Sequence, residues 1–163
     1  MPDTIPIDED HAEFMTRGVS ICVASCSPAR VPSVARAVGI RVSPDRRRVT
    51  VLVSATQAAT LLADVDATRR IAVTCVEPSS HRAMQLKGGD AARGSVQEDD
   101  LAMLTAHATR FVAEVQPLGF EPDLIARIIT CPPDDVVAID FTVDAVFVQT
   151  PGPRAGELLR ARA

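Results

Sequence analysis

The sequence predicts an α+β fold, a mainly β chain that forms a six-stranded antiparallel barrel with attached helices. About six apolar runs show the alternation or β-branched composition that is typical of strands, and most are joined by short turns. Only two or three helical segments interrupt them, so helices do not alternate with every strand. A parallel sheet would need a crossover after nearly every strand, which favours the antiparallel arrangement.

The first half of the chain contributes four of these strands. Residues 1–10 are expected to form a flexible or draped arm, and residues 11–17 a short helix that carries Phe14 inward. Ser54 or Thr56 is expected to cap a helix that ends near residue 64. The strands expected in this half span residues 19–24, 33–43, 49–54 and 71–76.

The second half contributes two strands and two helices. Residues 82–92 should form a strand, in which Gly88 and Gly89 indicate a bulge or a close backbone approach. Ser95 and Glu98 have capping-box spacing and predict a helix whose apolar stripe runs from Leu101 to Val115. The remaining expected elements are a helix at 122–129, a strand at 136–148 and a tail at 151–163, with residues 157–162 helical.

Length and composition limit the classes of protein that this chain can represent. Its 163 residues suit a single domain, 1–163, and its 47% hydrophobic residues argue against disorder. A net charge of −4 and an aromatic content of 3% argue against a general nucleic-acid binder. No apolar run is long enough to span a membrane, and the acidic N-terminus does not resemble a signal peptide, so we expect a cytoplasmic protein.

The four cysteines, Cys22, Cys26, Cys75 and Cys131, are expected to be small, reduced core residues. Cys22 and Cys26 would lie about 13 Å apart along one strand, too far for a disulfide. The sequence contains no Cys-x-x-Cys motif or histidine-rich cluster, so we expect no metal site.

Arg36 is the side chain that most clearly indicates a ligand. In an ideal strand it shares a face with Val34, Val38 and Ile40. A lone cation on an apolar face is costly unless an anion meets it, so an anionic ligand such as a nucleotide-type cofactor is one explanation. The alternative is an aliphatic stem that lies along the barrel with its guanidinium in water.

Several segments together resemble the pyridoxamine 5′-phosphate oxidase-like family, the FMN-binding split barrels. The order of the elements is similar over nearly the whole chain. The segments that carry the resemblance are GIRVSPD at 39–45, IAVT at 71–74, EPSSHRAMQLKG at 77–88 and QTPGPRAG at 149–156. The resemblance implies a six-stranded antiparallel split β-barrel of the FMN-binding type and a homodimer with a flavin in each cleft between subunits.

The resemblance also assigns candidate cofactor-binding residues. Arg36 and Arg41 match the two cations of the family's second-strand motif, and Ser54 lies at the end of the third strand, where polar groups meet the FMN phosphate. In an ideal strand Arg36 and Arg41 lie on opposite faces, so both can serve one ligand only if a bulge separates them. The candidates on the fifth strand are Arg82, Gln85 and Lys87.

Each fifth-strand candidate also has an ordinary explanation. Gln85 and Lys87 share a face and could bind the edge of a flavin ring, or they could be solvated residues of an exposed edge. Arg82 could pair with Glu77 or Asp90 instead of a ligand.

The chain departs from the pattern of the family's true oxidases at three places. Residues 57–59 read Gln-Ala-Ala where those enzymes carry Ser-Arg-Lys. Arg82 is followed by Ala83 rather than by glutamine, and there is no tryptophan to close a pyridoxal-phosphate pocket. These departures argue against vitamin B6 oxidation.

Three functions remain open at this point. The first is an FMN-dependent oxidoreductase of unknown substrate, in which the cofactor carries the chemistry and the sequence identifies no catalytic residue. The second is a split-barrel binding module that carries flavin, haem or a deazaflavin without turnover. The third is a dimer that has lost its cofactor.

Overall fold

The structure, a computed structural model, describes residues 6–161. Its strands are β1 (Ser20–Cys26), β2 (Pro32–Val42), β3 (Arg48–Ser54), β4 (Ile71–Val76), β5 (Ala83–Gly88), β6 (Ala92–Gly94), β7 (Val136–Thr142), β8 (Ala145–Val148) and β9 (Leu158–Ala161). Its helices are α1 (Glu9–Met15), α2 (Ala59–Thr68), α3 (Glu98–Val115) and α4 (Pro122–Ile129), with short 3₁₀ turns η1 (Gln116–Leu118) and η2 (Pro133–Asp135). Residues 1–5 of the expected arm lie outside the described residues.

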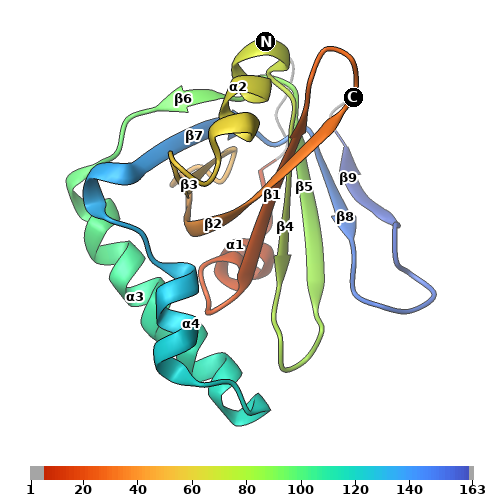
Figure 1. The fold of residues 1–163 in the computed structure, drawn as a ribbon. Coiled ribbons are helices and arrows are strands. Elements are labelled where there is room, and N and C mark those ends of the chain that lie inside the picture. Colours follow the sequence, from red (N-terminus) through yellow and green to blue (C-terminus); the bar gives the residue numbers. More distant parts are fainter. Residues whose placement is uncertain (1–5, 162–163) are drawn as a thin grey trace.

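The strands form one antiparallel sheet that closes on itself. Their order is β6-β7-β3-β2-β1-β4-β5-β8-β9. β7 pairs with β3 and β8 pairs with β5, and only Val143 and Asp144 separate β7 from β8. One stretch of chain therefore joins both margins of the sheet and closes it into a barrel (Figure 1).

The α+β class and the antiparallel pairing are confirmed, but the count of six strands is not. In residues 6–161 the sheet has nine strands. The strand expected at 82–92 is divided into β5 and β6, and the strand expected at 136–148 is divided into β7 and β8. A helix was expected at 157–162, but in the described part of that range the chain forms the ninth strand, β9, whose residues Leu158, Arg160 and Ala161 pair with β8.

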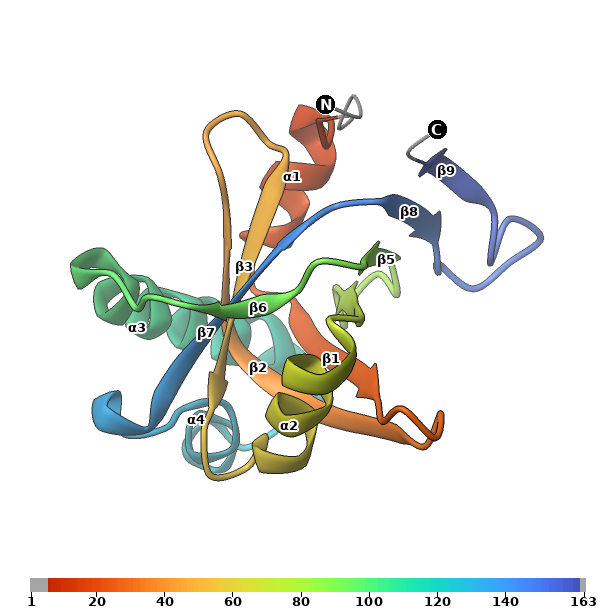
Figure 2. The same ribbon diagram turned by 90° about the horizontal axis from the view of Figure 1, so that it is seen from above.

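The barrel encloses an aliphatic core, as expected from the scarcity of aromatic residues. Phe14 of α1 is fully buried in this core, and Leu61, Leu62 and Val65 of α2 also pack into it. Helices α3 and α4 lie together on one side of the barrel, next to β2 (Figure 2). Their position leaves β1, β4 and β5 without a helix against their outer surface (Figure 1).

Three helix starts differ from the expectation, and the first is that of α1, which begins at Glu9 rather than at residue 11. The N-terminal cap of α3 is Gln97 rather than Ser95, because its backbone N–H reaches the carboxylate of Asp100 at 2.7 Å. Helix α2 begins at Ala59, and no side chain caps it. Leu101, expected in the packing stripe of α3, is 42% exposed, whereas Phe111 and Val115 are buried.

Strand β2 contains the bulge that decides where its arginines point. The register between β2 and β3 shifts between Ala37 and Gly39. Ala35 and Ala37 face the barrel core before the shift, and Ile40 faces it after the shift. The inward residues are therefore odd-numbered before the bulge and even-numbered after it. Arg36 and Arg41 therefore both project from the outer side of the barrel.

Candidate functional site

A helix-free sheet surface formed by the outward residues of β1, β4 and β5 is the candidate site, here called the outer face. Alternate residues of these strands are buried in the core, while Cys22, Ala24, Ala72 and Thr74 are exposed or half-buried. Because these outward side chains are small, the outer face can accept a flat partner at close range.

One row of residues crosses the outer face from strand to strand. Arg36 pairs with Cys22, Cys22 with Thr74, Thr74 with Gln85, and Gln85 with Phe147. Extending the β2–β3 register by one residue from the Ala37–Val53 pair places Ser54 next to Arg36. Three of the predicted site residues thus lie along one row.

Arg36 is a predicted cation whose hydrogen-bond partner is neutral. Its Nη1 donates to the hydroxyl of Ser20 at 2.8 Å. Among the ion pairs of residues 6–161, none involves Arg36. Its positive charge is therefore still available to an anion at the edge of the outer face.

Gln85 and Lys87 lie on the same face as Arg36, at the β5 side. The amide nitrogen of Gln85 donates to the hydroxyl of Thr74 at 3.2 Å. The ammonium of Lys87 lies 4.7 Å from the centre of the Phe147 ring. Both side chains keep further hydrogen-bonding capacity, so they can contact a polar ring edge.

Arg41 projects from the same side of β2 but is already paired. Its guanidinium contacts the carboxylate of Asp100 at 3.0 Å, and Asp100 is only 2% exposed. A buried carboxylate from α3 thus neutralises the second cation that the resemblance assigns to phosphate.

Ser54 is also committed to a carboxylate of the chain. Its hydroxyl donates to Asp135, which also accepts the hydroxyl of Thr56 at 2.7 Å and the N–H of Thr56 at 3.0 Å. The hydrogen bonds from Ser54 and Thr56 favour the charged form of Asp135 and lower its pKa below the ordinary value. The sequence pattern did not single out Asp100, which lies in the first turn of α3, or Asp135, which directly precedes β7.

Arg82 lies apart from the other candidates. It precedes β5, and its guanidinium stacks 4.4 Å from the Phe14 ring and bonds to Asp10 of α1. Its ion-pair partner is therefore Asp10 rather than Glu77 or Asp90, the two partners considered from the sequence.

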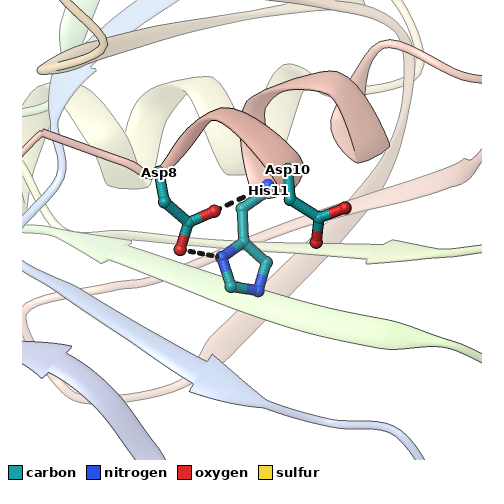
Figure 3. A group of neighbouring side chains, drawn as sticks. All are labelled: Asp8, Asp10 and His11. Carbon is teal, nitrogen blue, oxygen red and sulfur yellow. Dashed lines mark hydrogen bonds and ion pairs between the residues drawn. The ribbon is translucent and has the colours of Figure 1, made fainter.

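The group of Asp8, Asp10 and His11 brings three possible metal ligands together at the start of α1 (Figure 3). Asp8 caps the helix, with one oxygen 2.8 Å from the N–H of His11 and the other 2.6 Å from its ring. Arg82 bonds to Asp10, and Arg160 lies 3.9 Å from Asp8. Because cations already face both carboxylates, this group is better explained as a helix cap than as a metal site.

No helix among residues 6–161 combines the length and hydrophobicity that a membrane-spanning segment needs.

Comparison with known proteins identifies the fold. No protein-family model and no curated protein matches the chain. Solved structures do match it. HupZ of Group A Streptococcus has a TM-score of 0.54 at 13% identity, covering 92% of this chain and 99% of that one.

Two further structures agree in fold. An F420 reductase has a TM-score of 0.52 at 16% identity, covering 86% of this chain and 98% of that one. A proposed pyridoxamine 5′-phosphate oxidase from Lactobacillus delbrueckii has a TM-score of 0.52 at 12% identity, covering 88% and 94%. At these identities the likeness establishes the fold alone.

Proposed function

From the split-barrel fold that this chain shares with pyridoxamine 5′-phosphate oxidase-like proteins, we propose that the protein binds a flavin-type cofactor on its outer face, between two copies of the chain. One observation carries the proposal. Arg36, Gln85 and Lys87 gather on a sheet surface that no helix covers and whose other outward residues are small.

The ring side of a flavin fits the residues present. The amide of Gln85 and the ammonium of Lys87 can donate to the polar edge of an isoalloxazine ring, and Arg36 can meet an anionic tail. A bound flavin would supply hydride or electron chemistry, while the chain would orient it and exclude water. A second copy of the chain would cover the ring.

The phosphate side fits less well than the resemblance implies. Arg41 is paired with Asp100 and the hydroxyl of Ser54 with Asp135. Residues 57–59 add no cation. This favours a second candidate function, a binding module for a planar cofactor held without a phosphate clamp, such as a deazaflavin or haem.

The visible absorption spectrum of the purified protein tests the proposal first, because flavin, haem and empty protein differ plainly. Titration with FMN and riboflavin, followed by flavin fluorescence, then measures the phosphate preference. We expect both flavins to bind. FMN should bind about tenfold more tightly than riboflavin, because its phosphate gains one charge-assisted contact, with Arg36. A haem spectrum would select the second candidate, and failure to bind either flavin would contradict the first.

A matched pair of glutamine variants locates the ring. Gln85→Ala should weaken riboflavin binding by about fivefold, the loss of one neutral hydrogen bond. Gln116→Ala, an exposed position at the end of α3, should leave it unchanged. Equal effects of the two variants would place the flavin elsewhere.

A further inference from the structure

The end of β3 holds a set of hydrogen-bond donors that converge on one carboxylate. Asp135 of η2 accepts the hydroxyl of Ser54, the hydroxyl of Thr56 and the N–H of Thr56. The N–H of Ala55 donates to the backbone carbonyl of Asp135 at 2.7 Å, which holds the two segments together. Hydroxyl and backbone N–H donors of this kind are also those that bind phosphate in proteins.

The direction of each hydrogen bond shows that no donor of Ser54 is left over. The hydroxyl oxygen of Ser54 accepts the N–H of Gln57 at 3.1 Å, so its own proton points to Asp135. Both donors of Thr56 reach the same oxygen of Asp135. An incoming anion would have to displace this carboxylate to reach them.

The surroundings provide space but add negative charge. A cavity of about 460 Å³ lies beside these donors, lined by Ser54, Thr56, Thr130, Asp134 and Asp135 among others. It is large enough for a phosphate group, yet two carboxylates face it. The negative charge of these two carboxylates, rather than a lack of space, would therefore keep an anion out of this cavity.

We infer that Asp135 is a resident anion that fills the phosphate position at the end of β3, so that this residue makes the protein select against phosphorylated ligands at this edge of the barrel. The inference refines the cofactor specificity of the proposed function. It also applies to free inorganic phosphate, and so it can be tested even if no flavin binds.

The test compares three proteins in their response to inorganic phosphate, using thermal unfolding at constant ionic strength with chloride as the reference anion. Asp135→Ala frees the donors, and Asp134→Ala removes a neighbouring exposed carboxylate with the same change in net charge. We expect Asp135→Ala to bind phosphate at least about tenfold more tightly than the wild type, and Asp134→Ala, which lowers the repulsion but frees no donor, to gain much less. An equal phosphate response in the two variants, or phosphate binding by the wild type, would overturn the inference.

Two further variants make the result specific. Adding Ser54→Ala to Asp135→Ala should reduce the gained response, because one of the three freed donors is removed. If Asp135→Ala does not fold, Asp135→Asn keeps the shape without the charge. It should still exceed the wild type in phosphate binding, and absence of that gain would overturn the inference.

The flavins separate this inference from the proposed function. In Asp135→Ala the preference for FMN over riboflavin should rise by about tenfold. If neither flavin binds to any variant, the proposed function fails, while the phosphate comparison still decides the role of Asp135.

Discussion

Arg36, Arg41 and Ser54 show how partners inside the chain decide which polar groups remain available. Asp100 pairs with Arg41 and Asp135 accepts from Ser54, whereas Arg36 donates to the neutral hydroxyl of Ser20. A guanidinium that is paired with a carboxylate is neutralised, whereas one that donates to a hydroxyl keeps its net positive charge. Of these three residues, Arg36 is thus the one suited to meet an external anion.

Arg36→Ala should weaken FMN binding by about tenfold or more and riboflavin binding much less, because the lost group meets the anionic tail. Arg36→Lys should restore part of the affinity by keeping the charge. Arg127→Ala, an exposed arginine of α4, serves as the control for net charge. Fluorescence titration measures the affinities. If Arg36→Ala lowers the melting temperature but leaves flavin affinity unchanged, Arg36 is a structural residue.

His107 of α3 is a buried titratable residue that makes stability depend on pH. Burial, with a smaller contribution from Arg110, lowers its pKa from 6.5 to about 4. As pH falls below 6.5, the unfolded chain binds a proton that the folded chain refuses, so folding is weakened until the pH reaches about 4. The loss over this window amounts to about 3 kcal/mol at most.

The expected result is a smaller acid sensitivity in His107→Leu. Urea unfolding at neutral pH and at about pH 5 should show a drop for the wild type that the variant largely lacks. A drop of equal size in both proteins would show that other groups, such as carboxylates, cause the acid sensitivity.

At the level of elements, the bulge in β2 and the start of α3 belong together. The bulge turns Arg41 outward, where Asp100 receives it. Asp100 also accepts the first free N–H of the helix, from Gln97. Gly39 allows α3 to lie this close to β2, because a Cβ atom at position 39 would lie 2.6 Å from the Leu104 side chain of α3.

Asp100→Ala should therefore destabilise the protein by about 2–3 kcal/mol, since it removes a helix cap and leaves Arg41 without its partner. Asp99→Ala removes an exposed acidic residue from the same first turn. It should cost less than about 1 kcal/mol. Urea unfolding measures both variants, and a similar cost for the two would contradict the double role of Asp100.

The whole molecule presents the outer face without a covering helix, and a second copy of the chain is the proposed cover. Val34, which adjoins this face on β2, is 68% exposed. Exposed apolar sheet surface is typical of interfaces, and a twofold dimer is the commonest arrangement. The same contact would enclose a cofactor lying on the outer face.

Two cysteines report on this interface. Cys22 is exposed on the outer face, while Cys75 is buried and burial raises its pKa to about 12. A thiol reagent should label Cys22 quickly in dilute protein and more slowly as the concentration rises into the dimer range, whereas Cys75 stays unreactive throughout. Sedimentation measures the dimer independently. A dimer in which Cys22 keeps its full labelling rate would use another surface.

Much of the fold could be predicted because local patterns carry it. Apolar alternation predicted strands among β1 to β4, and the prolines at its two ends marked α4. The aliphatic core and the inward position of Phe14 also followed from composition and spacing. These properties depend on neighbours within a few residues, which a sequence shows directly.

The resemblance named Arg36, Gln85 and Lys87 among six candidates for cofactor binding, and the tertiary structure placed these three on one sheet face. Pairing across the sheet made β9 a strand where a helix was expected, and it closed β7 and β8 into the barrel. Contacts between residues 59 and 81 positions apart joined Arg41 to Asp100 and Ser54 to Asp135. Such pairings depend on how distant segments meet in space, and local composition does not encode them. The sequence by itself therefore determined most of the elements and the candidate residues, while the packed barrel decided the number of strands and which candidates keep a charge that no carboxylate neutralises.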